Sequence, residues 1–369
     1  MTPSDAARGD PRLLRLAAVR DRLARVDLDG VLLTHLANVR YLTGFSGTSA
    51  LLFVSARECL LFTDFRYAGQ VEEELGTSTA VQIEQTSLWA GLWSWLAGIT
   101  GVERIGFESG HLAHRDFARL LEQGQRWHWR PVTELVEELR AVKDAGEIAA
   151  IERAVAMAEA ALQVTLPQIH PGMTELAVAG LLERALRDEG SEAFPFPTIV
   201  AAGPRSALPH ARAGDRLLQP SDLLLLDFGA VADGYCADLT RTVVVGPSTE
   251  DQREVHAIVR EANLRASGAV RAGMTGMAAD AVARDYIASF GYGEAFGHSL
   301  GHGIGLEVHE APRLARSVET VLQPGSVVTI EPGIYRGGWG GVRIEDDVLV
   351  TESGRRVLSS CPRELLELD

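Results

Sequence analysis

Two aspartates on either side of a turn are the first residues whose types and spacing could do chemistry. Asp227 and Asp238 lie in the segment DFGAVADGYCADLTRT, eleven residues apart across a turn that contains Ala-Asp-Gly. If this turn is centred between Ala232 and Asp233, the two carboxylates are direct cross-strand neighbours, with Cβ atoms about 5 Å apart. Like charges that face each other destabilise a hairpin unless a cation neutralises them. The spacing therefore predicts a cation site.

A second pair of acidic residues has the same arrangement further along the chain. Glu331 in TIEPGIY and Glu345 in VRIEDD are placed symmetrically about Gly338, which lies inside RGGWGG. Arg343 stands two residues before Glu345 and therefore points to the same face of that strand. Four inward-facing carboxylates on two hairpins predict a site built from hard oxygen ligands.

Histidines between the two hairpins can complete this ligand set. The segment GHSLGHGIGLEVHE supplies His298, His302 and His309, and its glycines let the backbone come close to a metal or a substrate. Oxygen ligands with one imidazole suit Mn, Co, Zn or Fe. Two such ions about 3.5–4 Å apart can polarise a carbonyl and hold a hydroxide nucleophile. Each residue alone is also typical of a turn, a loop or a strand end, so the prediction depends on their occurring together.

Length, charge and cysteine content limit the class of protein. The chain has 369 residues, which indicates two domains. Its formal net charge of -15 argues against nucleic acid as a partner, because an acidic surface repels phosphates. The three cysteines are too few and too widely spaced for a disulfide framework or a CxxC metal site. We see no apolar run of signal-peptide or membrane-span length, and we expect a cytoplasmic protein that does not bind membranes.

The elements that must position the site residues fall into two groups. Strands and helices alternate at first, which predicts an N-terminal α/β domain over residues 1–135. Helix pairs then alternate with antiparallel hairpins, which predicts an α+β domain over residues 136–369. In the first domain we expect helices at 11–26 and 88–99 and strands at 30–34, 49–55, 58–64 and 104–109. In the second we expect a helical tract at 131–169 that is interrupted near 143–146, helices at 174–190, 249–273 and 276–291, and strands at 196–203, 222–231, 234–246, 326–335 and 340–352.

These motifs resemble a known family, the metal-dependent "pita-bread" peptidases, which include methionine aminopeptidase, aminopeptidase P and prolidase. The resemblance rests on LLLLDFGA, CADLTRT, GHSLGHGIGLEVHE, TIEPGIY and GVRIEDD, in this order along the chain. The N-terminal motifs ANVRYLTGFSG and TDFRYAGQ resemble the proline-specific branch of prolidases and aminopeptidases P. The resemblance implies a pita-bread α+β catalytic domain preceded by a smaller α/β domain of the creatinase/prolidase type.

The same resemblance implies roles for individual residues. Asp227 would bind one metal, Asp238 and Glu345 would bridge two, and His302 and Glu331 would bind the other. Glu331 also resembles the general base of the family. Four further residues match positions beside the substrate or the bridging carboxylate: His210 in SALPHARAGDR, His298, His309 and Arg343. The resemblance further implies two divalent ions per subunit, with Mn as the first choice and Co or Zn compatible, and a homodimer.

The expected reaction is hydrolysis of the peptide bond before proline. A proline nitrogen carries no hydrogen and its ring locks φ, so a dedicated pocket is useful, and Phe194, Phe196 and Tyr235 are candidates for its wall. Arg313, four residues beyond His309, resembles the prolidase residue that faces the free carboxylate of an Xaa-Pro dipeptide. We therefore expect short proline-containing peptides as ligands and favour a dipeptidase. An aminopeptidase P that acts on longer peptides stays open, and an inactive peptide-binding relative is disfavoured because every ligand is present.

Overall fold

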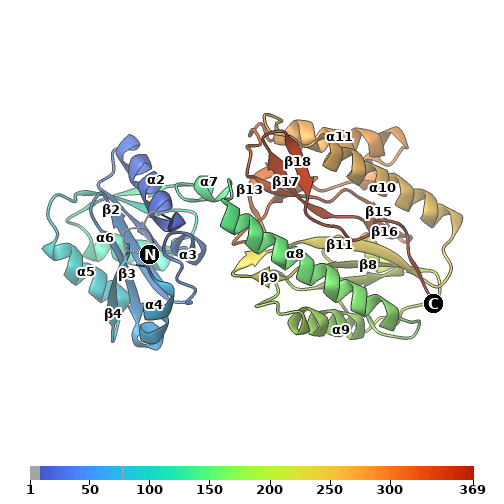
Figure 1. The fold of residues 1–369 in the computed structure, drawn as a ribbon, viewed down its shortest axis with the longest axis horizontal. Coiled ribbons are helices and arrows are strands. Elements are labelled where there is room, and N and C mark those ends of the chain that lie inside the picture. Colours follow the sequence, from blue (N-terminus) through green and yellow to red (C-terminus); the bar gives the residue numbers. More distant parts are fainter. Residues whose placement is uncertain (1–8, 77) are drawn as a thin grey trace. The chain divides into compact units, whose positions relative to one another are not determined.

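The computed structural model describes residues 9–76 and 78–369, and the chain divides after Arg140 into two compact units (Figure 1). The N-terminal unit contains one six-stranded sheet with helices packed on it. The C-terminal unit contains the two hairpins that carry the acidic residues. Within the described residues, no helix combines the length and the apolar character needed to cross a membrane.

The sheet of the N-terminal unit is mixed. Its strand order is β4 (Ala80–Glu84), β3 (Cys59–Asp64), β2 (Ala50–Ser55), β1 (Gly30–Leu33), β5 (Arg104–Glu108) and β6 (His128–Val132). Strand β2 is antiparallel to both neighbours, whereas β4, β5 and β6 pair in parallel with the strands beside them. The helices are α2 (Pro11–Arg25), α3 (Leu36–Thr43), α4 (Ala68–Glu74), α5 (Leu88–Gly98), α6 (His114–Gln123) and α7 (Glu137–Arg140).

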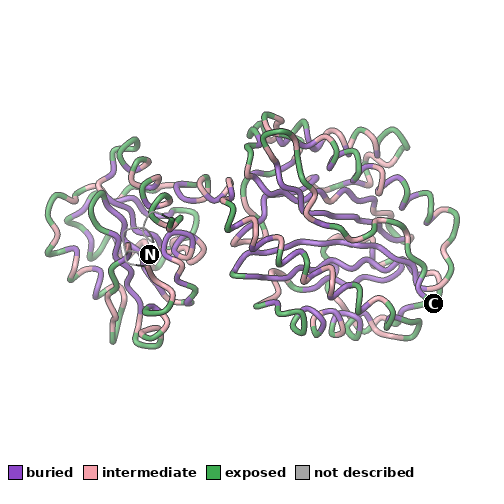
Figure 2. The backbone as a smooth tube through the Cα atoms, in the orientation of Figure 1, coloured by how far each residue is buried: buried purple, intermediate pink, exposed green. Residues whose placement is uncertain are grey.

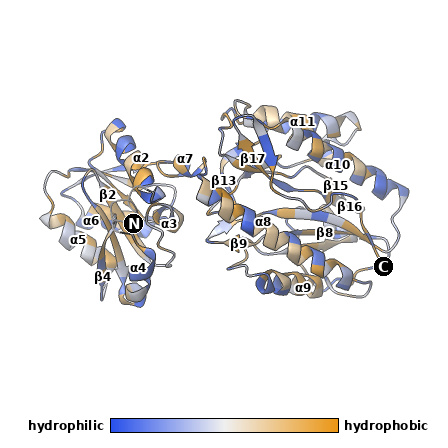
Figure 3. Cartoon of the chain, viewed as in Figure 1, coloured by the Kyte–Doolittle hydropathy of each residue, from blue (hydrophilic) through white to orange (hydrophobic). Residues whose placement is uncertain are grey.

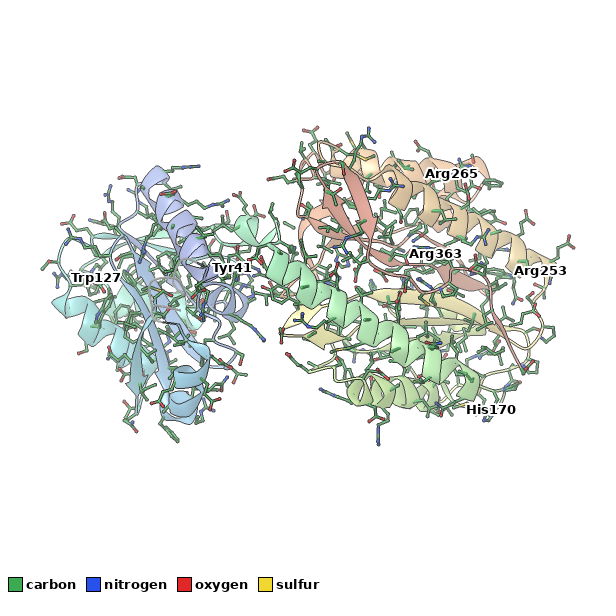
Figure 4. The ribbon with its side chains drawn as sticks, viewed as in Figure 1. Tyr41, Trp127, His170, Arg253, Arg265 and Arg363 are labelled. Carbon is green, nitrogen blue, oxygen red and sulfur yellow. The ribbon has the colours of Figure 1, made fainter. Side chains whose placement is uncertain are left out.

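The core of this unit depends on large apolar side chains from several elements. Phe53 and Phe62 are fully buried on adjacent strands, and both make edge contacts with the Trp95 ring of α5. Trp127, which is labelled in Figure 4, packs against Trp93 with ring centroids 6.1 Å apart. Aromatic rings of this size bury much apolar area each, so a few of them stabilise a small unit.

The helical tract expected at 131–169 is in part wrong. Its first residues, 131–132, belong to the edge strand β6, where Pro131 is tolerated because edge positions do not all need an N–H donor. Only α7 and α8 (Ala145–Thr165) are α-helical, and they are separated by residues 141–144. Asp144 begins α8 with a capping box, since its carboxylate accepts from the Glu147 N–H and the Glu147 side chain accepts from the Asp144 N–H.

The C-terminal unit contains two sheets, each with its own pair of helices (Figure 1). In the first half, α8 and α9 (Glu175–Asp188) pack on a sheet of order β19 (Glu367–Leu368), β11 (Leu239–Val245), β8 (Asp222–Phe228) and β7 (Ile199–Ala202). In the second half, α10 (Glu250–Ala269) and α11 (Gly276–Ser289) pack on a sheet of order β13 (Glu310–Leu314), β12 (Gly301–Gly303), β14 (Val327–Ile330), β17 (Asp346–Thr351) and β18 (Gly354–Val357). Two short ribbons, β9 (Val231–Ala232) with β10 (Tyr235–Cys236) and β15 (Gly333–Arg336) with β16 (Gly340–Arg343), extend the central hairpins.

The two halves of this unit repeat the same local plan. Thr174 begins α9 and Thr275 begins α11, and each hydroxyl caps its helix by accepting an N–H three residues later. The Leu218 N–H donates to the Met173 carbonyl, and the Leu322 N–H donates to the Met274 carbonyl, both at 2.8 Å. Each of these leucines begins a Leu-Gln-Pro segment that leads into an acid-bearing strand, so Asp227 and Glu331 occupy corresponding places.

The strands that lead to the site are buried on both faces. Every residue of β8 and β11 is buried, and the central strands form the continuous buried layer of this unit in Figure 2. Figure 3 shows the same strands with the hydrophobic colour along much of their length. A strand covered on both sides reads as a continuous apolar run, as in Leu223 to Leu226. A carboxylate at the end of such a strand is therefore withdrawn from water.

Candidate active site

The first hairpin differs in register from the sequence prediction. Asp227 lies opposite Thr240, not opposite Asp238. The turn is centred between Asp233 and Gly234, whose φ values of 48° and 79° are those of a two-residue turn with both central residues left-handed. Asp238 precedes Thr240 by two residues, so it still projects to the face that carries Asp227. The two aspartates are diagonal neighbours, and the prediction of direct pairing was wrong.

The second hairpin has the predicted register. Residues 327–330 pair with 346–349, and residues 333–336 pair with 340–343. Both paired segments have the same register, and Glu331 and Glu345 lie in the unpaired stretch between them. In this gap the Glu331 N–H donates to the Leu300 carbonyl at 2.8 Å. The Glu345 N–H donates to the Thr240 carbonyl of the first hairpin at 3.1 Å. The interruption therefore joins the two hairpins and brings their acidic residues together.

A buried asparagine on helix α10 bonds to the backbone on both strands of this unpaired stretch. Asn263 of α10 is fully buried, and its amide donates to the carbonyls of Ile330 and Ile344 at 2.9 and 3.2 Å. These two carbonyls directly precede Glu331 and Glu345. One side chain thus fixes the backbone at both glutamates, and the sequence analysis did not identify it.

His302 presents one ring nitrogen to the carboxylates. Its Nδ1 lies 3.1 Å from the Gly303 carbonyl, an acceptor, so the proton belongs on Nδ1 and the Nε2 lone pair is left for a ligand. Nε2 lies 3.5 Å from Glu331 and 3.8 Å from Asp238. Burial lowers the pKa of His302 to about 4, so the ring is neutral at neutral pH. Glycine is required on both sides, because a Cβ at Gly301 would lie 2.0 Å from the Thr329 oxygen of β14 and a Cβ at Gly303 would lie 2.1 Å from the Ala311 oxygen of β13.

The carboxylates of the site are buried and repel one another, so keeping them ionised without a cation costs free energy. Burial raises the pKa of Asp238 and Glu331 well above their ordinary values, and the charge of Glu345 raises both further. Burial and the charge of Asp227 raise the pKa of Glu345 to about 8. Among the described residues, three buried oxygens of the cluster accept no hydrogen bond: Asp227 Oδ1, Asp238 Oδ1 and Glu345 Oε1. Buried polar atoms without a donor call for another partner.

Divalent cations fit this donor set. Asp238, His302 and Glu345 each offer a ligand atom, and these atoms all lie within 4.8 Å of one another. Asp227 and Glu331 add two more carboxylates, and the charges of both help to raise the pKa of Asp238. The charge of Asp227 also raises the pKa of Glu345. Oxygen donors with one imidazole match the preferences of Mn²⁺, Co²⁺ and Zn²⁺. The five predicted ligands are thus brought together, and their unsatisfied oxygens are the observation that favours metal binding.

Arg343 lies at the centre of a hydrogen-bonded chain beside the cluster. Its guanidinium donates to Asp227 Oδ2, to the Thr240 hydroxyl at 3.1 Å and to the Tyr335 hydroxyl at 2.8 Å. Tyr335 in turn lies 2.8 Å from His298 Nε2, and the other ring nitrogen of His298 faces the Ser299 carbonyl. The geometry therefore places the Tyr335 proton toward His298. Sequence reasoning found Arg343 and His298 but missed Tyr335 and Thr240, whose hydroxyl donates to Glu345 at 2.6 Å.

A second arginine holds the backbone that follows Glu345. The buried guanidinium of Arg241 donates to the Glu345 carbonyl at 2.6 Å and to the Asp346 carboxylate at 2.9 Å. Arg363, labelled in Figure 4, donates to the other Asp346 oxygen at 2.6 Å. Two arginines thus pair with the buried carboxylate of Asp346 beside the cluster and offset its charge.

The remaining predicted residues lie at the exposed rim or in the core. His210, His309 and Arg313 are exposed, and the His309 ring packs edge-on against His302 with centroids 4.3 Å apart. The charge of Arg313 contributes to lowering the pKa of both His302 and His309. Tyr235 is buried in the apolar core, where its hydroxyl donates to Glu147 at 3.0 Å, so its expected place in a pocket wall was wrong. The structure thus offers an open, basic edge beside the acidic cluster.

The fold and the site together define a metal-dependent hydrolase with a separate N-terminal domain. Residues 149–352 match the model of metallopeptidase family M24, and residues 15–142 match that of the creatinase/prolidase N-terminal domain. The chain belongs to metallopeptidase family M24 and is an enzyme of that class. Enzymes of this family use divalent metal ions, in agreement with the donor set.

Individual relatives cover almost the whole chain. An Xaa-Pro dipeptidase of Pyrococcus furiosus is 39% identical over 92% of this chain and 95% of its own. The structure of an Xaa-Pro dipeptidase from Bacillus anthracis has 39% identity and a TM-score of 0.92 over 97% of this chain and 100% of its own. That of an X-Pro aminopeptidase from Thermotoga maritima has 37% identity and a TM-score of 0.89 over 96% and 99%. The prediction of a proline-specific pita-bread relative with a creatinase-type N-terminal domain is confirmed.

Replacing Asn263 tests whether its bonds to the backbone position the predicted metal ligands Glu331 and Glu345. Asn263→Ala leaves two buried carbonyls without their amide donor, and such groups cost about 1–3 kcal/mol each. We expect reduced stability and an affinity for Co²⁺ that falls by about 10–100-fold, measured by visible absorption of the cobalt-loaded chain. Val259→Ala, which removes buried methyl groups from the core on the same helix, is the matched control and should lose stability without losing Co²⁺ affinity. Equal affinity in the two variants would show that Asn263 has no positioning role.

Metal binding should release protons from the cluster. Between the ordinary pKa of 4.5 and the raised pKa of about 8, Glu345 in the folded metal-free chain keeps a proton that the unfolded chain has lost. The metal-free chain should therefore lose stability as pH rises through this interval, since the unfolded state then binds fewer protons. A cation displaces the retained protons. Titration of Mn²⁺ near neutral pH, in buffers of different ionisation enthalpy, should report net proton release, and the absence of any release would contradict the raised pKa values.

Proposed function

We propose that this enzyme hydrolyses Xaa-Pro dipeptides with two divalent ions held by Asp227, Asp238, His302, Glu331 and Glu345. The convergence of the five side chains in a buried cluster with unsatisfied oxygens carries the metal part of the proposal. The donor set favours Mn²⁺, with Co²⁺ and Zn²⁺ compatible. Bound ions would supply the Lewis acid that polarises the scissile carbonyl and activates water.

The protein side chains would then orient the substrate and move protons. Glu331 faces His302 and His298, at 3.5 and 3.9 Å, and its raised pKa suits a group that takes a proton and later gives it up. His309 and His210 lie at the exposed rim, where they can donate to the peptide carbonyl or to the leaving proline nitrogen. The chain through Tyr335, Arg343 and Asp227 keeps the base and the ligands in place.

Arg313 decides between the two substrate classes in this proposal. The dipeptidase from Bacillus anthracis and the aminopeptidase from Thermotoga maritima resemble this chain almost equally, so overall similarity does not separate them. A dipeptide ends in a carboxylate next to the scissile bond, and a cation near His309 can bind it. Arg313 is exposed and close enough to influence the pKa of His309. This observation favours Xaa-Pro dipeptides over longer peptides.

A set of three substrates tests the proposal. We expect Ala-Pro to be cleaved faster than Ala-Pro amide and Ala-Pro-Ala, because only Ala-Pro has its carboxylate within reach of Arg313. Arg313→Gln should lower kcat/KM for Ala-Pro by about 10–100-fold, mostly through KM, in line with the loss of about 1.5–3 kcal/mol for a charged hydrogen bond. Exposed Arg316 offers a matched control, and Arg316→Gln should behave as wild type.

Two other outcomes of these assays would contradict the proposal. Cleavage of the amide and the tripeptide at least as fast as Ala-Pro would identify an aminopeptidase P. Failure to cleave any of the three after metal reloading would contradict the peptidase assignment and favour a peptide-binding role.

A further inference from the structure

Three side chains of the N-terminal unit converge on one point that the proposed reaction does not use. His35 directly precedes α3, His111 lies in the loop between β5 and α6, and Glu137 begins α7. His35 Nδ1 lies 3.8 Å from Glu137 Oε1, and His111 Nε2 lies 3.7 Å from the same oxygen. One ligand atom from each residue lies within 4.8 Å of the other two. Segments far apart in sequence thus direct two imidazoles at one carboxylate.

These separations match those of metal ligands. Ligands bonded to one tetrahedral Zn²⁺ at about 2.0–2.2 Å lie about 3.3–3.6 Å from each other, which is longer than an ordinary hydrogen bond. The His–carboxylate distances of 3.7 and 3.8 Å are close to this value. They are also similar to the spacing in the catalytic cluster, where His302 lies 3.5 and 3.8 Å from its two carboxylates.

Neighbouring side chains hold His35 and Glu137 in this arrangement. The Asn38 amide donates to Glu137 Oε1 at 2.6 Å and to the buried carboxylate of Glu108 at 2.7 Å. Glu108 also accepts the N–H of His35 at 2.8 Å, which fixes the start of α3. Arg140 donates to the side-chain oxygen Oδ1 of Asn38 at 2.7 Å. Such outer contacts orient the ligands of a metal site and increase its affinity.

The charges around the three residues also favour a cation. The rings of His35 and His111 are stacked with centroids 3.6 Å apart and an interplanar angle of 8°, so two charged imidazoles would repel each other strongly. Burial alone would raise the pKa of Glu137, but the nearby His35 ring and the Asn38 amide outweigh it and lower the pKa to about 2. The site therefore combines an ionised carboxylate with two imidazoles.

We propose that His35, His111 and Glu137 bind one Zn²⁺ ion, separate from the catalytic metal ions. Two imidazole nitrogens and one carboxylate are a donor set that Zn²⁺ accepts, with the fourth position left to water. The exposed fractions of 14%, 38% and 24% for the three side chains leave a path for the ion and the water. On binding, the stacked rings must fan apart, because a metal lies in the plane of each imidazole. The ion would tie α3, the loop before α6 and α7 together within the N-terminal unit.

Metal content of the full chain tests this site. Metal-free wild-type chain is dialysed against micromolar Zn²⁺ and its zinc is counted, together with the His111→Ala and Glu137→Gln variants. We expect each variant to hold one ion fewer per chain than wild type and to retain hydrolysis of Ala-Pro. His114→Ala, an exposed histidine at the start of α6, is the matched control and should hold as many ions as wild type.

A variant that lacks two ligands of the catalytic site separates zinc binding at the N-terminal site from metal binding at the catalytic site. The full chain with Asp238→Ala and His302→Ala should still bind one Zn²⁺ ion, as measured by calorimetry, and should lose that ion when His111→Ala is added. Equal zinc content in wild type and in the His111→Ala and Glu137→Gln variants, or no zinc in the Asp238→Ala, His302→Ala background, would overturn the proposal. Neither result depends on which peptide the enzyme cleaves.

Discussion

Repulsion among buried carboxylates is the constraint on which the rest of the catalytic unit depends. Asp227, Asp238, Glu331 and Glu345 approach one another in a region where burial already disfavours their charged forms. In the described part of the chain, the guanidinium of Arg343 is the cation that bonds to one of these carboxylates, Asp227. Among the described residues, Asp227 Oδ1, Asp238 Oδ1 and Glu345 Oε1 accept no hydrogen bond and need a partner from outside the chain. In our proposal divalent ions supply that charge, so the feature that destabilises the metal-free fold is the one that would bind metal.

The two-fold repeat explains how a single chain assembles such a cluster. Each half begins a helix at Thr174 or Thr275 and returns through a Leu-Gln-Pro segment into a buried strand. An acidic residue lies near the end of that strand, Asp227 within β8 and Glu331 directly after β14. The strand partner brings a second acidic residue to the same face. Backbone bonds between the hairpins, such as that from the Glu345 N–H to the Thr240 carbonyl, then join the two pairs.

Prediction from the sequence succeeded where local rules decide the structure. The positions of Glu331 and Glu345 followed from the symmetry of one hairpin about Gly338, whose φ of 78° suits the turn. The same rule misplaced Asp227 against Asp238, because Ala-Asp-Gly allows two turn centres and the left-handed conformation of Asp233 and Gly234 selects the later one. Asn263 could not be found in this way, since its partners Ile330 and Ile344 come from a distant hairpin. Contacts between remote segments carry no local sequence signal.

The most direct measurement compares the stability of wild type and the isosteric variant Asp238→Asn with and without metal. If repulsion in the cluster is relieved by bound cations, Asp238→Asn should raise the unfolding free energy of the metal-free chain at slightly alkaline pH. The same variant should lower the unfolding free energy of the Mn²⁺-loaded chain and abolish hydrolysis of Ala-Pro. A variant that is destabilised without metal, or that keeps wild-type metal stabilisation and activity, would contradict the account.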